Sequence, residues 1–83
     1  MYKITKTIDN TVTVSLHLDD VIDAQKIFSD LQYDEYIRFK KLYESGIRKE
    51  IREEKVDGKL VCREYRISVP TFGVTITLEY VEN

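Results

Sequence analysis

The segment from Ile47 to Val69 consists of two strand-like runs on either side of the dipeptide Asp57-Gly58. An Asp-Gly pair between such runs is among the strongest short-range signals for a β-hairpin. Both runs are dense in charged residues. Opposite charges that face each other across an antiparallel pair stabilise it by about 0.2–1 kcal/mol, whereas like charges destabilise it. The charges therefore restrict how the two arms can pair.

One register of the two arms sets opposite charges face to face. Its facing pairs are Glu53 with Arg63, Arg52 with Glu64, Glu50 with Arg66, Ile51 with Tyr65, Ile47 with Val69, and Val56 with Leu60. A tight two-residue turn would instead set Arg52 against Arg63. We therefore predict the first register, with a loop of three residues from Asp57 to Lys59 or a longer loop in that register. Residues 48–55 also fit an exposed helix, but the charge match favours a strand.

The flanking segments add three more strands. Residues 1–8 alternate between apolar and polar side chains, and the turn formers Asp9-Asn10 follow them. Residues 11–18 alternate most regularly, and we expect the apolar set Val12, Val14, Leu16 and Leu18 to share one face. Residues 72–81 alternate in the same way after a corner at Pro70-Thr71. We expect this last strand to lie beside strand 11–18.

The segment between residues 20 and 45 shows a helical repeat of apolar residues. Asp19 or Asp20 can cap its start, and Ser45-Gly46 can end it. One unbroken helix of this extent would be about 39 Å long at 1.5 Å per residue, which is long for so small a protein. We therefore expect a break between Ser29 and Asp34 that gives two helices.

These elements predict an α+β fold. An antiparallel sheet of about five strands, in the order β-β-α(α)-β-β-β, carries the helical segment on one face. The chain of 83 residues has room for a single domain, residues 1–83, with one small core. It has no apolar run long enough to span a bilayer and no signal-peptide core, so we expect a cytoplasmic protein.

No catalytic, cofactor-binding or metal-binding constellation is apparent. Cys62 is the only cysteine, which excludes an intramolecular disulfide and favours a small buried hydrophobe. His17 precedes Asp19 and Asp20, yet a strand that runs into a helix start would scatter these side chains, so we expect an exposed histidine and capping acids. The glycines lie apart from one another, and no serine has a recognisable base. We predict that the protein is not an enzyme and uses no cofactor or metal.

Tyrosines and acidic residues are the more informative candidates for a partner-binding surface. The sequence holds six tyrosines, and residues 9–35 carry seven acidic residues against one lysine. Tyrosine is enriched at interface hot spots, and an acidic stretch can imitate nucleic-acid phosphates. The candidate partner-binding residues are Tyr33, Tyr36, Tyr43, Asp19, Asp20, Asp23, Asp34 and Glu35. The alternative for both groups is ordinary: rings that pack on the sheet, and acids that cap the helix and keep the protein in solution.

These observations favour a small non-enzymatic protein that binds a protein partner and regulates or inhibits it. Size and composition associate such proteins with phages and mobile elements, including anti-CRISPR proteins. One alternative is a nucleic-acid-binding module that uses the basic residues of the 48–66 hairpin, although acids interleave with them. Another is a structural homo-oligomer formed through the tyrosine-bearing helix or an exposed strand edge.

Overall fold

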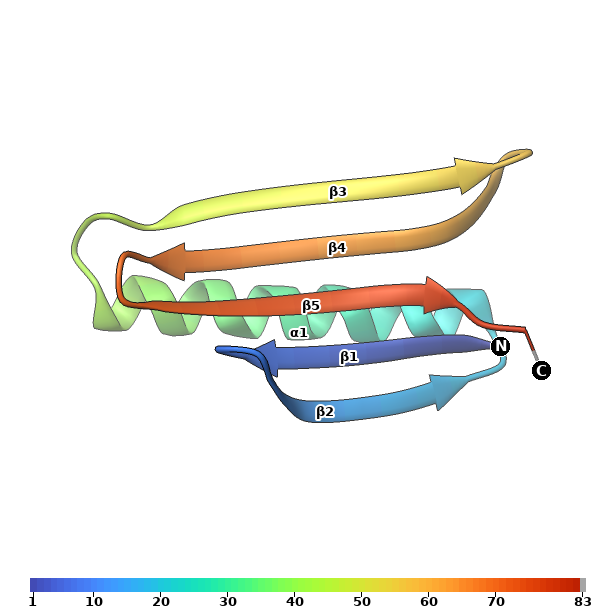
Figure 1. Cartoon of the computed structure of the whole chain (residues 1–83), viewed down its shortest axis with the longest axis horizontal. Helices are drawn as coiled ribbons and strands as arrows, with labels where there is room; N and C mark the ends of the chain where they lie inside the picture. The colour runs from blue at the N-terminus through green and yellow to red at the C-terminus, as the bar shows by residue number, and fades with distance from the viewer. Residues whose placement is uncertain (83) are drawn as a thin grey trace.

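A computed structural model describes residues 1–82 of the protein. These residues form one helix and a five-stranded sheet, and the helix lies along the sheet (Figure 1). The elements are β1 (Tyr2–Ile8), β2 (Thr11–Leu18), α1 (Val21–Leu42), β3 (Arg48–Val56), β4 (Lys59–Val69) and β5 (Phe72–Tyr80). All neighbouring strands are antiparallel, in the order β2-β1-β5-β4-β3. The predicted α+β architecture is confirmed.

The first and the last strand of the chain, β1 and β5, pair with each other inside the sheet. β1 pairs with both β2 and β5, so Ile4 lies opposite Leu16 on one side and Leu78 on the other. The expectation that strands 11–18 and 72–81 are neighbours is therefore wrong. Their similar alternation reflects a shared apolar face, and that face does not specify which strands pair.

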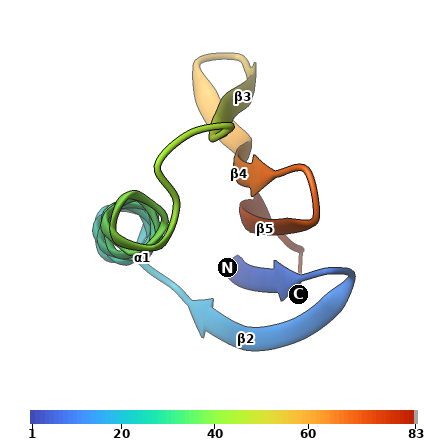
Figure 2. The ribbon, with the colours of Figure 1, turned by 90° about the vertical axis from the view of Figure 1, so that its left-hand side faces the viewer.

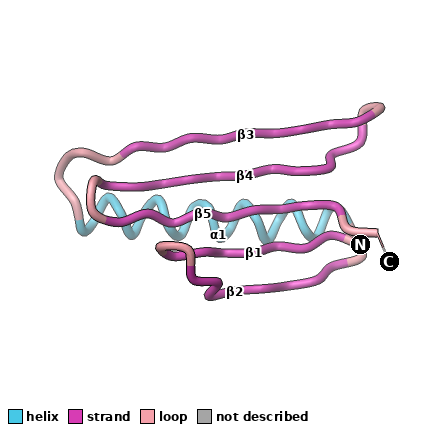
Figure 3. Tube along the Cα trace, viewed as in Figure 1, coloured by secondary structure: helices cyan, strands magenta, loops and turns pink. Residues whose placement is uncertain are grey.

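The helix is continuous, and the expected break between Ser29 and Asp34 is wrong. Its 22 residues span about 33 Å at 1.5 Å per residue, and the longest dimension of the molecule is 41 Å. β4, with 11 residues, reaches about 36 Å at 3.3 Å per residue, so the sheet is long enough to support an unbroken helix. Figure 3 shows α1 running beside the strands along nearly their full length.

Both ends of α1 follow from local chemistry. Asp20 is the N-cap, and its Oδ1 accepts hydrogen bonds from the backbone N–H groups of Ile22 at 2.7 Å and Asp23 at 3.3 Å. Such a cap satisfies donors that have no partner within the helix. At the other end, the N–H of Tyr43 donates to the carbonyl of Phe39 at 2.9 Å. The left-handed backbone of Gly46, with φ of 80°, turns the chain toward β3.

The core lies between α1 and the three central strands. Phe28 and Phe39 of the helix are fully buried, as are Ile4, Ile76 and Leu78 of the sheet. One charged group also lies inside: Glu35 is 2% exposed and forms an ion pair with Lys6, which the register of β1 places on the apolar face. Oε2 of Glu35 is buried and accepts no hydrogen bond within residues 1–82.

The β3–β4 hairpin confirms the predicted charge register and corrects the predicted loop. Glu53 faces Arg63, Arg52 faces Glu64, Glu50 faces Arg66 and Ile51 faces Tyr65. The connection, however, is a two-residue turn, Asp57-Gly58, with φ of 53° and 77°. Next to the turn, Val56 faces Lys59 in place of Leu60, and a bulge between Glu54 and Lys55 then shifts the register by one residue. A tight turn and favourable charge pairing coexist because the bulge absorbs the difference.

A second bulge corrects the expected face of strand 11–18. The β1–β2 register shifts between Lys6 and Thr7, so Val14 faces Lys6 but Val12 faces Thr7. Thr7 belongs to the outer face, and Val12 is 59% exposed there. Val14, Leu16 and Leu18 keep the predicted apolar face.

Candidate functional site

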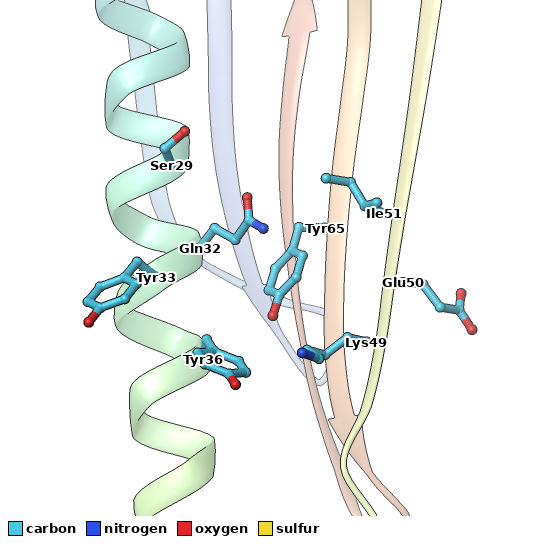
Figure 4. Close-up of a pocket in the computed structure, with 8 residues that line it drawn as sticks. All are labelled: Ser29, Gln32, Tyr33, Tyr36, Lys49, Glu50, Ile51 and Tyr65. Carbon is cyan, nitrogen blue, oxygen red and sulfur yellow. The ribbon is translucent and has the colours of Figure 1, made fainter.

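A groove lies between α1 and the β3–β4 hairpin. Its volume is about 550 Å³. We call it the α1–β3 groove, and its lining residues are Ser29, Gln32, Tyr33, Tyr36, Lys49, Glu50, Ile51 and Tyr65. Figure 4 shows that the helix supplies one wall and that the hairpin supplies the other.

The groove exists because one helix cannot cover five strands. The backbone of α1 lies against those of β5, β1, β4 and β2 but not that of β3. All nine residues of β3 are exposed, including Ile51, whose partner Tyr65 is 4% exposed. In the end view of Figure 2, β3 continues the sheet beyond the edge of α1. The apolar side of the sheet therefore reaches solvent beside the helix.

Aromatic rings and one cation define the chemistry of the groove. Lys49 reaches across the gap, and its Nζ lies 4.4 Å from the centre of the Tyr36 ring, a cation–π distance. Lys40 approaches the same ring at 5.4 Å. Tyr65 forms the floor, and its burial raises the pKa of its phenol. Glu50 points away from the groove in Figure 4, as expected for a residue that faces Arg66 on the other side of the sheet.

The structure divides the predicted tyrosine group. Tyr33 and Tyr36 both line the groove, and Tyr33 is 64% exposed. Tyr43 lies at the C-cap of the helix, where its ring packs 5.4 Å from that of Phe39. In Figure 4 the Tyr36 ring points toward the hairpin and the Tyr33 ring lies on the outer side of the helix wall, whereas Tyr43 helps to close the end of the core.

The acidic candidates also fall into separate environments. Asp19 and Asp20 are exposed at the start of the helix, and Asp20 is engaged as its cap. Asp23 and Asp34 are exposed along the helix, and residue spacing sets them with Asp30 on one solvent-facing stripe. Glu35 is in the interior, where Lys6 and, at 3.4 Å, Nη1 of Arg38 contact its Oε1. It is therefore not part of the exposed acidic surface.

Sequence reasoning overlooked the hairpin wall of the groove. Lys49 and Ile51 were identified only as members of a charged strand, yet their register with Ile67 and Tyr65 sets them on the helix side of the sheet. The signal was present in that register. What no residue pattern indicated was that α1 stops short of β3.

The other candidate reactive residues, Cys62 and His17, lie on different strands, β4 and β2. Cys62 is partly buried on the outer face between Glu54 and Glu79, and burial raises the pKa of its thiol, with the charge of Glu79 adding to the effect. His17 is exposed opposite Lys3. Among residues 1–82, no three side chains of His, Cys, Asp or Glu gather where they could hold a metal ion.

Comparison with known proteins adds no relative, since no family model, curated protein or solved structure matches the chain. Within residues 1–82, no helix has the length and the apolar character needed to cross a membrane. The functional argument therefore starts from the groove and its chemistry.

Proposed function

We propose that the protein is a non-enzymatic binding module that regulates or inhibits a protein partner by docking it in the α1–β3 groove. The observation that carries the proposal is the exposure of Tyr33 and Ile51 on opposite walls of one groove, at 64% and 59%. Large side chains of this kind lose much solvent-exposed area when a partner covers them. Tyrosine does so at low conformational cost and is over-represented among interface hot spots.

The groove also indicates what the partner presents. Its floor and walls take an apolar side chain, because Tyr36, Tyr65 and Ile51 converge there. The ammonium groups of Lys49 and Lys40 lie beside that apolar surface and attract a carboxylate. The matching segment is an apolar residue followed or preceded by an acidic one, held in a partner chain that fits alongside α1.

Protein is favoured over nucleic acid by the pairing of charges in the hairpin. Arg63 donates a hydrogen bond from Nε to Oε2 of Glu53 at 3.1 Å. On the outer face, Arg52 and Arg66 each lie opposite a glutamate. A phosphate backbone would meet a carboxylate beside most of these arginines, whereas nucleic-acid readers keep their basic surface free of acids.

Site-specific photo-crosslinking in extracts of the source cells tests the proposal. A photoreactive phenylalanine replaces Tyr33 in one variant, Ile51 in a second and Thr77, on the outer face, in a matched control. We expect the first two variants to capture the same protein and the control to capture none of it. An excess of unlabelled protein should compete, and an excess of the Tyr33→Ala, Ile51→Ser double variant should not.

Equal capture from position 77, or competition by the double variant as strong as by the unchanged protein, would contradict the groove as the docking site. Circular dichroism of every variant shows whether it has kept the fold. A gel-shift titration with single- and double-stranded DNA and RNA at low salt addresses the competing function, and we expect no shift.

A further inference from the structure

We propose that two copies of this protein associate through the free edge of β2, so that their sheets join into one continuous antiparallel sheet. The surface involved is separate from the α1–β3 groove, and the proposal does not depend on the function assigned to that groove. It rests on the contrast between the two free edges of the sheet, on the regular part of β2 and on the self-complementarity of that part.

The two edges of the sheet differ sharply in charge. β3 carries the sequence Arg-Lys-Glu-Ile-Arg-Glu-Glu-Lys-Val, and charged side chains along an edge discourage pairing with another strand. β2 reads Thr-Val-Thr-Val-Ser-Leu-His-Leu and has no lysine, arginine, aspartate or glutamate. An uncharged edge strand offers its unpaired N–H and C=O groups to another chain without electrostatic opposition.

The bulge limits the pairing edge to one end of β2. The register shift beside Thr13 distorts the strand near its turn, and the ladder is regular from Val14 to Leu18. Val14, Leu16 and Leu18 face the helix side, and Ser15 and His17 face the other side. The helix covers this edge incompletely, since Leu16 remains 38% exposed.

This regular segment is complementary to itself. A two-fold axis at Leu16 sets that residue opposite its own copy, Val14 opposite Leu18 and Ser15 opposite His17. Each facing pair then lies on the same face of the joined sheet, as the two-residue period of a strand requires. Asp19 comes opposite Thr13 of the second copy, so no like charges face each other. The apolar faces of the two copies then form one continuous surface.

The size of the contact sets the expected strength. Two short edges bury less than the roughly 800 Å² per partner of a standard interface, so a reversible dimer with a micromolar dissociation constant is expected. Main-chain hydrogen bonds supply the affinity, as in other cases of strand addition.

Sedimentation equilibrium of the purified chain, over total concentrations from about 1 μM to 1 mM, tests the proposal. The mass should rise from that of the 9.8 kDa monomer toward the dimer. Leu16→Lys places two lysines face to face and should weaken association by about tenfold or more. Val56→Lys introduces the same residue at an exposed position of the other edge strand, outside the α1–β3 groove, and should leave association unchanged.

Mixing charges then tests the register. Leu16→Glu alone should also weaken association, whereas an equimolar mixture of the Leu16→Lys and Leu16→Glu variants should restore it, because Leu16 faces its own copy. A monomer at every concentration overturns the proposal. So does a dimer that Val56→Lys disrupts and Leu16→Lys does not, or a mixture that stays dissociated. Circular dichroism confirms that each variant is folded, so loss of association is read only from folded protein.

Discussion

The two hairpins of the molecule are built alike at their turns and differently along their strands. Each is closed by two residues with positive φ, Asp9-Asn10 in one and Asp57-Gly58 in the other, and each contains a bulge. In the first hairpin, the edge strand β2 lies against α1 and keeps Val14 and Leu18 half-buried, whereas in the second hairpin all nine residues of the edge strand β3 are exposed. Packing against α1 therefore helps to hold β2 in place, while cross-strand charge and main-chain hydrogen bonds hold β3.

This difference suggests a division of labour within one sheet. The region under α1 supplies the stability of the fold, and β3 is the exposed wall that we propose as part of the docking site. Regions with few buried contacts open at low free-energy cost, and binding surfaces are often drawn from such regions.

The largest expected contrast comes from truncating one apolar residue in each region. Phe28→Ala removes a fully buried ring and should reduce the free energy of unfolding by about 3–5 kcal/mol. Ile51→Ala removes a side chain that is 59% exposed and should change it by about 0.5 kcal/mol or less. Urea denaturation followed by circular dichroism measures both. Similar losses for the two variants would mean that β3 is packed into the core.

The buried ion pair between Lys6 and Glu35 should have the next-largest effect on the free energy of unfolding. Glu35→Ala leaves Lys6 in the interior without its carboxylate and should cost about 3 kcal/mol. The matched double variant Lys6→Met, Glu35→Leu removes both charges and should recover most of that loss, because an apolar pair requires no desolvation of ions. The exposed pair of Lys55 and Glu53, 3.4 Å apart, offers a control whose removal should matter little. A double variant as unstable as the single one would show that the interior requires the ions themselves.

The turn of the exposed hairpin should show a smaller and more local effect. Gly58→Ala forces a side chain into a backbone with φ of 77°, and apart from the two chain neighbours no atom of residues 1–82 lies within 4 Å of the added Cβ to raise the steric cost. The expected loss is about 1 kcal/mol. Because β4 is the only strand within residues 1–82 that pairs with β3, hydrogen exchange should quicken in β3 amides while amides of β1 and β5 keep their rates. Uniform acceleration across the sheet would instead indicate that the hairpin and the core unfold together.

The smallest expected effect concerns the Glu53–Arg63 pair and its dependence on pH. The hydrogen bond from Arg63 holds the pKa of the Glu53 carboxyl below its usual range. A lowered pKa in the folded state stabilises the fold above the pKa of the unfolded chain, and that contribution is lost as the pH falls through the folded pKa. Glu53→Gln should therefore quicken exchange of β3 amides near neutral pH, and this difference in protection factors should disappear as the pH falls through the lowered pKa of Glu53. A difference that persists in acid would contradict the ionic origin.

Local signals made most of the fold predictable. Turn-forming pairs, strict alternation and the facing charges of Glu53 and Arg63 indicated the elements and the hairpin register correctly. The errors arose where one part of the chain had to be fitted to another. Each bulge shifts one ladder by one residue, and the bulge in the β1–β2 ladder moves Val12 to the outer face. The unbroken helix depends on the length of the sheet, which only the assembled strands define.

The candidate site was predictable only in part. Tyr33 and Tyr36 stood out as exposed aromatic residues of a helix, and both line the groove. Glu35 resembled its acidic neighbours in sequence, but it faces inward because Lys6 occupies the apolar side of β1. The contribution of Ile51 depends on how far α1 extends across the sheet, which is a property of packing and not of any single segment.

The measurement that tests the central claim most directly is an NMR titration of the isotope-labelled protein with the partner recovered by crosslinking. The account predicts that chemical shifts change around Tyr33, Tyr36, Ile51 and Tyr65, while signals from the outer-face row through Thr5 and Thr77 stay in place. Shift changes centred on the outer face, with the groove signals unmoved, would contradict it.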